Sequence, residues 1–417
     1  MEQLLSLLKT IPEYAAMVSS LQDGESVAVT GIGQINRSHM IAGLCRSINR
    51  PMVVLCQDDL AARRLQEELK GFLADTAPIL PGRDLTLYDA AVVSRSWEQK
   101  RLRQLYDLAT GKTGLQIMTW ESLSLRTMPK AALLAAAFSL EVGREYAVED
   151  LISRLTAAGY NRCGMVEGPG QFAVRGGILD IFSPAEDRPV RAEFFGDELD
   201  TMGFFDPATQ RRSENITSVT VLPVAETQPG LHPGGVEGLC KDITSLISRQ
   251  KRRKNINEPL IATLEKDLNK YESGLHNPAS DRYMALIYPE FTTAASYLPQ
   301  EAIVAFCDHG NLQRGEKDRA EEFGLLLDSF LPSGTLFGEL CDYYATIDDL
   351  AASLRGRAVI YCDSFLAARY PESLPPKQLL SFTARQLPGY GGSLETAAAD
   401  LKNYASNQYG SIVLCGV

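Results

Sequence analysis

The sequence lacks long apolar runs, and it lacks the N-terminal pattern of an exported protein. Its longest purely apolar run, Ala131 to Phe138, is far shorter than the about 20 residues that a membrane-spanning helix requires. The first residues, MEQLLSLLKTIPEY, include acids and show neither a basic start nor a small-residue cleavage site. We therefore expect a cytoplasmic protein that does not enter a membrane.

Paired cysteines and clustered histidines are also missing. No two cysteines form the C-x-x-C pair that zinc sites commonly use, and the four histidines are far apart. Several cysteines lie in strand-like apolar runs such as VVLC and VIYC, where cysteine behaves as a small hydrophobic side chain. The sequence therefore predicts no metal site, no cofactor and reduced, buried thiols at Cys45, Cys56, Cys163, Cys240, Cys307, Cys341, Cys362 and Cys415.

The chain has too few basic residues to bind nucleic acid over its whole surface. Lysine and arginine number 41 against 52 aspartates and glutamates, so the net charge is −11 and any such contact must be local. One basic run, Arg249 to Lys254, could contact DNA. It could equally be a solvated turn balanced by nearby acids, and we favour this interpretation because those acids are close in sequence: Glu258, Glu265 and Asp267.

Two patterns of secondary structure divide the 417 residues. In the first part, strand-like runs such as SVAVTG and PMVVLCQD alternate with helical patterns such as Asp59 to Leu73, which indicates a parallel sheet with helices on its faces. Between Phe172 and Val224, strands instead follow one another with short turns, which indicates a largely antiparallel unit. Helical patterns over residues 236–276 and the strand-like run EAIVAFCD then follow.

We therefore expect an α/β parallel-sheet domain that is interrupted by a smaller, largely antiparallel α+β domain. The first domain should comprise residues 1–137 and 227–345, and the inserted domain residues 138–226. Residues 346–417 should begin a further α/β domain. The chain stops at the strand-like run SIVLCGV, without the crossover helix that a parallel strand normally precedes, so we expect the front portion of a longer protein.

A degenerate phosphate-binding loop follows the first predicted strand. Such a loop needs G-x-x-x-x-G-K-[ST], in which backbone N–H groups surround the phosphates, the lysine neutralises them and the hydroxyl holds Mg²⁺. Gly31 and Gly33 are present, but no lysine stands between Thr30 and Leu44. The G-K-T continuation is replaced by three uncharged residues, Gln34, Ile35 and Asn36. We therefore expect a P-loop-like domain without ATP turnover.

Two further features fall short of a nucleotide site. The triplet beginning at Gly111 spells GKT, but Tyr106 stands where the first glycine is required, and the triplet ends a helix instead of opening one. The strand IVAFC is followed by Asp308, where a Mg²⁺-linked acid pair is expected, and His309 replaces the second acid. The sequence thus predicts a degenerate acid site.

One long segment has a specific family resemblance. Residues 171–212, QFAVRGGILDIFSPAEDRPVRAEFFGDELDTMGFFDPATQRR, resemble a signature shared by UvrB excision-repair proteins and the N-terminal module of the Mfd family of transcription-repair coupling factors. The match continues through SVTVLPVAE and YPEFTTAASYLPQEAIVAFCD. UvrB has an intact phosphate loop, an acid pair and a tyrosine-rich hairpin, whereas this chain has TGIGQIN, CDHG and the short LTLYDAAVVSRSWEQ. All three departures are similar to Mfd.

The resemblance implies a non-catalytic interaction module that recruits UvrA of nucleotide excision repair to RNA polymerase stalled at DNA lesions. It also implies that the polymerase-interacting domain and the ATP-dependent translocase motor of the family lie outside this chain. One alternative is a UvrB-like ATP-dependent enzyme that processes damaged DNA, which the missing loop lysine disfavours. Another is a general DNA-binding α/β protein, which the net charge disfavours.

The signature also contains a candidate binding surface. Side chains alternate along a strand, so Arg191, Glu193 and Phe195 of VRAEFF should face away from the apolar core, and Arg175 ends the strand FAVR on its polar side. An aromatic residue beside arginines on a rigid strand is typical of an interface. The resemblance implies that Arg175, Arg191 and Phe195 bind UvrA. Alternatively, Phe195 lies under a helix and the arginines pair with an acid of this segment, Asp180, Glu193 or Asp197.

Overall fold

A seven-stranded parallel sheet forms the centre of the structure, a computed structural model that describes residues 2–89, 96–365, 367, 369–383, 390 and 392–411. The strands are arranged in the order β15–β1–β14–β13–β2–β4–β3, and all neighbours are parallel. In chain order they are β1 (Val27–Thr30), β2 (Met52–Cys56), β3 (Ile79–Leu80), β4 (Leu115–Thr119), β13 (Ile303–Cys307), β14 (Val359–Cys362) and β15 (Gln378–Ser381).

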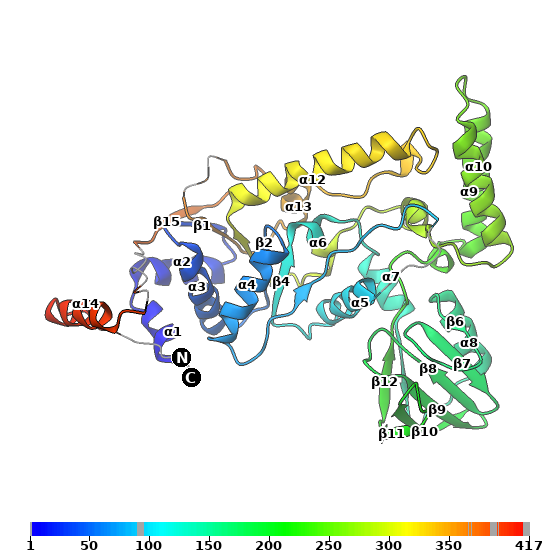
Figure 1. Cartoon of the computed structure of the whole chain (residues 1–417), viewed down its shortest axis with the longest axis horizontal. Helices are drawn as coiled ribbons and strands as arrows, with labels where there is room; N and C mark the ends of the chain where they lie inside the picture. Colours follow the sequence, from blue (N-terminus) through cyan, green and yellow to red (C-terminus); the bar gives the residue numbers. More distant parts are fainter. Residues whose placement is uncertain are drawn as a thin grey trace.

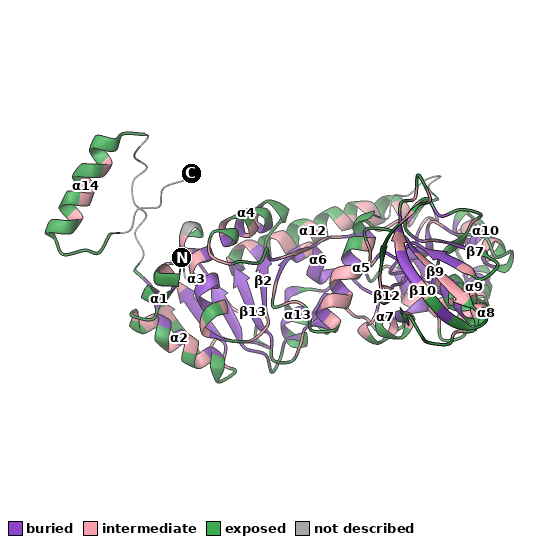
Figure 2. Ribbon diagram, turned by 90° about the horizontal axis from the view of Figure 1, so that it is seen from below, coloured by how far each residue is buried: buried purple, intermediate pink, exposed green. Residues whose placement is uncertain are grey.

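Helices cover both faces of this sheet, so its inner strands are buried, whereas the edge strand β15 is partly exposed (Figures 1 and 2). Along β2, Val54 packs in one core and Val53 and Leu55 in the other, because successive side chains point to opposite faces. This two-sided burial explains the nearly continuous apolar runs. One core includes α1 (Glu2–Leu8), α2 (Pro12–Gln22), α3 (Gln34–Ser47) and α4 (Asp59–Lys70). The other includes α5 (Ser96–Ala109), α6 (Trp120–Ser124), α7 (Lys130–Ala136), α11 (Met284–Ile287) and α13 (Ile347–Ser353).

Residues 138–226, here called the inserted unit, contain a separate six-stranded sheet at the lower right of Figure 1. Its order is β11–β10–β9–β8–β7–β6, antiparallel except between β6 and β7, and one face packs against a helix, α8 (Val148–Ala157). The strands are β6 (Asn161–Arg162), β7 (Gln171–Arg175), β8 (Ile178–Ile181), β9 (Val190–Phe195), β10 (Glu198–Phe205) and β11 (Arg212–Asn215). A two-stranded sheet pairs β5 (Phe138–Glu141) with β12 (Ser218–Val221). The expected fold class is thereby confirmed.

The remaining helices extend the central domain. The antiparallel pair α9 (Gly235–Lys251) and α10 (Glu258–Glu272) projects at the upper right of Figure 1. The others are α12 (His309–Phe330), α14 (Leu394–Ser406) and the 3₁₀ turns η1 (Pro229–Leu231), η2 (Ser280–Tyr283), η3 (Ala294–Tyr297) and η4 (Gly338–Leu340). Within the described ranges, no helix is both long and apolar enough to cross a membrane. The cysteines described there are free thiols, and Cys415 lies outside the described residues.

The segment after residue 346 contributes two strands to the central sheet. We expected residues 346–417 to begin a further domain, but β14 and β15 lie on either side of β1 in the central sheet. Val29 pairs with Cys362 of β14 and with Leu380 of β15. The boundary at 346 therefore does not separate two sheets. Strands β1 and β13 share one sheet, as expected, and the division of the chain into domains stays a prediction; residues 412–417 of SIVLCGV lie outside the described residues.

A group of buried ion pairs joins the end of the inserted unit to the central domain. Arg101 of α5 and Glu226 are both fully buried, with Nε and Oε1 2.8 Å apart. Beside them, Arg83 pairs with Glu98 at 2.9 Å and with Asp281 at 3.0 Å. Arg101 also donates to a hydroxyl and two backbone carbonyls, those of Thr127, Pro81 and Ser122. Paired and hydrogen-bonded in this way, these charges can lie in the interior.

We expect Glu226→Gln to lower the free energy of unfolding by about 3 kcal/mol, because the buried Arg101 guanidinium loses its compensating charge. Glu265→Gln is the control: Glu265 is half-exposed and pairs with an exposed lysine, so its loss should cost less than about 1 kcal/mol. Urea denaturation followed by circular dichroism measures both. Equal effects of the two substitutions would contradict a special role for the buried pair.

Candidate protein-interaction site

Gly31 of the degenerate loop is explained by strand packing. Its φ is +78°, which favours glycine, and a Cβ there would lie 2.0 Å from the carbonyl oxygen of Phe382. The Phe382 amide donates to the carbonyl of Thr30 at 2.9 Å, which brings the end of β15 against the loop. Gly33 is the N-cap of α3, and a Cβ there would have open space. The requirement for Gly31 therefore comes from β15, without a phosphate.

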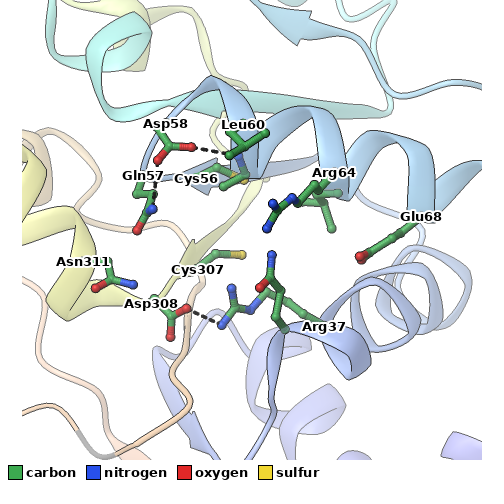
Figure 3. Close-up of a pocket in the computed structure, with 13 residues that line it drawn as sticks. Arg37, Cys56, Gln57, Asp58, Leu60, Arg64, Glu68, Cys307, Asp308 and Asn311 are labelled. Atoms are coloured by element: carbon green, nitrogen blue, oxygen red, sulfur yellow. Dashed lines mark hydrogen bonds and ion pairs between the residues drawn. The ribbon is translucent and has the colours of Figure 1, made fainter. Parts of the chain in front are cut away.

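An ion pair lies between the degenerate loop and the degenerate acid site (Figure 3). Arg37, in the first turns of α3, donates through Nη2 to Asp308 Oδ2 at 2.7 Å. Asp308 Oδ1 also accepts from the backbone N–H and the hydroxyl of Ser364. Arg37, Asp308 and Gln34 line a small cavity of about 150 Å³. Because its oxygens are occupied by a guanidinium and a serine, Asp308 is poorly suited to hold Mg²⁺.

His309 does not replace the missing acid functionally. Its side chain is fully buried among aromatic rings, including those of Tyr361 and Tyr370, and its backbone N–H donates to Asp363 Oδ1 at 2.7 Å. Burial lowers the pKa of His309, so the ring stays neutral. Neither ring nitrogen has a hydrogen-bond partner among the described residues. His309 is thus a core aromatic side chain.

Asn36 of the predicted loop belongs to the first turn of α3. The backbone N–H of Asn36 donates to the carbonyl of Gly33 within the first turn of α3. The side chain of Ile35 lies outside the described residues. The sequence analysis did not identify Arg37 as the ion-pair partner of Asp308. The available signal was a positive charge four residues after Gly33.

We expect no heat of binding in an isothermal titration of the chain with Mg²⁺–ATP up to about millimolar concentration. Arg37, the cation in the first turn of α3, is paired with Asp308, so it cannot compensate phosphate charge at the backbone N–H groups there. Micromolar binding of Mg²⁺–ATP would contradict this account of the loop.

The second predicted site lies on the outward face of the six-stranded sheet. Along β9, Val190 and Ala192 are buried against α8, whereas Arg191 and Glu193 are partly exposed, so the predicted alternation is confirmed. Arg191 lies between Asp180 of β8 and Gly203 of β10 in the sheet register. The outward face therefore brings together side chains from several strands.

Phe195 is the most exposed large hydrophobic residue described in the inserted unit. It ends β9 at a tight turn and is 84% exposed, so the alternative that it lies under a helix is wrong. An exposed aromatic side chain leaves apolar surface in water that a partner can bury. The exposed position of Phe195 is therefore consistent with the prediction that it contacts a partner protein.

Both arginines pair with one fully buried carboxylate, that of Asp180. Arg191 donates through Nε to Oδ1 at 2.7 Å and through Nη2 to Oδ2 at 2.9 Å. Arg175 donates through Nη2 to Oδ2 at 2.5 Å. The Arg175 side chain is 46% exposed, but the Arg191 side chain is only 16% exposed. A side chain that contacts a partner should be largely accessible to solvent, and Arg191 is not. The alternative was therefore right about the pairing with Asp180.

Two further contacts fix Arg191, and sequence reasoning missed both. Its guanidinium lies over the Phe205 ring, 4.6 Å from the centroid. It also donates to the backbone carbonyl and the side-chain oxygen of Gln210, each at 3.3 Å. Gln210 has a φ of 59°, and its side-chain amide donates to the carbonyls of Val166 and Pro207. The hydrogen bond to Asp180 raises the pKa of Arg191 further, so the guanidinium remains charged.

The basic run lies at the tip of the α9–α10 pair. Arg249 and Arg253 both pair with Glu339, and Lys251 pairs with Glu265. All of these side chains are about half-exposed, so the pairs support the interpretation as a solvated turn.

The inserted unit has a recognisable family pattern. Residues 138–226 match the family model of the UvrB interaction domain. The chain resembles transcription-repair-coupling factors. It is 21% identical to that of Bacillus subtilis (strain 168) over 99% of the chain and 35% of the relative. The factor of Myxococcus xanthus is 32% identical over 51% of the chain and 18% of the relative.

A third relative agrees. The transcription-repair-coupling factor of Staphylococcus aureus (strain Mu50 / ATCC 700699) is 25% identical over 93% of the chain and 33% of its own length. Over nearly its full length, the chain spans about a third of the Bacillus subtilis and Staphylococcus aureus factors. The resemblance expected from the sequence is thereby confirmed, and Arg175, Arg191 and Phe195 all lie within the part that matches the UvrB interaction domain.

We expect Arg191→Ala to lower the free energy of unfolding by about 2 kcal/mol, because Asp180 is fully buried and loses two of its hydrogen bonds. Phe195→Ala should change it by less than about 0.5 kcal/mol, since the ring is exposed. Urea denaturation of both variants tests the contrast. A large loss of stability in Phe195→Ala would show that the ring is packed.

Proposed function

We propose that this chain is a non-catalytic interaction module of a transcription-repair coupling factor, which recruits UvrA to RNA polymerase stalled at a DNA lesion. The observation that carries the proposal is the outward sheet face, where the exposed Phe195 lies on the same side as Arg175 and Arg191. Its position within the match to the UvrB interaction domain supports the choice of partner.

The chemistry of the face suits a protein partner with acidic and apolar groups. Arginine has five N–H donors in a planar fork that fits carboxylates. Within the described part of the chain, Arg175 uses only Nη2, so its remaining donors can bind a carboxylate of UvrA. Phe195 can enter an apolar pocket of the partner. Arginine and aromatic side chains are common among the residues that dominate binding energy.

The central domain supports a scaffold role. A UvrB-like enzyme needs a cation for the nucleotide phosphates and a free acid for Mg²⁺, but Arg37 and Asp308 occupy each other. Contacts with RNA polymerase and with DNA, and the translocase motor, would belong to the parts of the longer coupling factors that this chain does not span.

We expect Arg175→Ala and Phe195→Ala each to weaken UvrA binding by about 2 kcal/mol, roughly thirtyfold, because each removes a central contact. Surface plasmon resonance with purified UvrA measures the loss. Matched controls are Arg249→Ala and Tyr88→Ala, which remove an exposed arginine and an exposed aromatic residue from the central domain. Undiminished UvrA binding by a folded Arg175→Ala, Phe195→Ala double variant would defeat the proposal.

A further inference from the structure

We propose that Asp180 is a positioning residue, whose buried carboxylate orients the Arg175 guanidinium toward the carboxylate of a protein partner. This inference rests on the proposed function, since the partner is UvrA. It adds a residue that does not itself contact the partner, because Asp180 has no exposed surface.

The sheet register creates the arrangement. Asp180 of β8 pairs with Arg191 of β9 on one side and with Ala173 of β7 on the other. Arg175 stands two residues beyond Ala173, on the same side of the sheet, so its long side chain can return to Asp180. One carboxylate on the central strand thus binds guanidiniums from both neighbouring strands.

The charges on this part of the face do not cancel. One carboxylate faces two guanidiniums, which leaves one positive charge in excess, whereas the neighbouring Glu193 and Arg212 pair with each other at 3.0 Å. A surplus cation held on a rigid sheet attracts an anionic group of a partner. The complementary chemistry is a carboxylate at the surface of UvrA.

The two arginines contribute unequally. Arg191 donates to both oxygens of Asp180 and to two oxygens of Gln210, and it stacks on Phe205, so it is largely used within the unit. Arg175 makes one hydrogen bond to Asp180 within the described residues and is nearly half-exposed. Asp180 thus fixes Arg175 at one N–H and leaves the others for the partner. Fixing a flexible side chain beforehand reduces the entropy that binding must remove.

A double-mutant cycle on UvrA binding tests the inference. Asp180→Asn should weaken binding about tenfold in the otherwise unchanged chain, because Arg175 is no longer held in place. In the Arg175→Ala background, Asp180→Asn should weaken binding less than about twofold further, since the residue that it positions is gone. Losses that multiply in the double variant, or unchanged binding by Asp180→Asn, would overturn the inference.

The same cycle separates the inference from the proposed function. If Arg175→Ala leaves UvrA binding unchanged, the positioning role is wrong, and if the Arg175→Ala, Phe195→Ala double variant also binds undiminished, the proposed binding surface is wrong. If Arg175→Ala weakens binding but Asp180→Asn does not, the surface stands and only the positioning role is wrong. The Glu193→Gln variant is the matched control, because it removes a charge from the same face but leaves the hydrogen bonds of Asp180 in place.

A second measurement needs no substitution at Asp180, where a variant could fail to fold. Nuclear magnetic resonance of ¹⁵N-labelled chain reports rotation about the Cζ–Nε bond of each arginine. Rotation in Arg175 should be several-fold slower than in Arg162, an exposed arginine of the same sheet, because Asp180 holds one of its Nη groups. Equal rotation rates in the two side chains would overturn the inference.

Discussion

A carboxylate that is wholly or partly removed from water must be compensated by a cation or by hydrogen bonds. Three of the places where this constraint acts among the described residues bear on the proposed function. Glu226 pairs with Arg101 where the chain returns from the inserted unit. Asp308 pairs with Arg37 beside the degenerate loop. Asp180 pairs with two arginines on the outward sheet face. The first two pairs each match one anion with one cation, whereas the third leaves a positive charge in excess at the surface.

This difference distinguishes the central domain from the proposed binding surface. The Glu226 pair is fully buried, so a partner protein cannot reach it, and in the Asp308 pair Arg37 and Asp308 neutralise each other. On the sheet face, the excess charge lies on the same side as an exposed aromatic ring. In the proposed function, the degenerate nucleotide fold is thus a rigid support, and recognition takes place on a neighbouring antiparallel sheet.

The local sequence pattern was sufficient to predict which side chains share a face of a strand. It was insufficient to predict which side chains of neighbouring strands pair with one another. Alternation in VRAEFF predicted that Arg191 and Phe195 share a side, because that depends on one strand alone. The two-to-one pairing at Asp180 depends on the register of three strands, which a single sequence does not determine. Non-local pairing also explains why the sequence did not predict that β14 and β15 join the central sheet, since β15 pairs with β1 across most of the chain. The same contact between β15 and the loop after β1 accounts for Gly31.

Hydroxyl-radical footprinting of the chain with and without UvrA tests the central claim most directly. Phe195 is 84% exposed in the free chain, so it should be oxidised readily when alone. If the outward sheet face binds UvrA, oxidation of Phe195 should fall several-fold in the complex, while oxidation of the exposed Tyr88 in the central domain stays unchanged. A complex in which Phe195 is oxidised as fast as in the free chain would contradict the account.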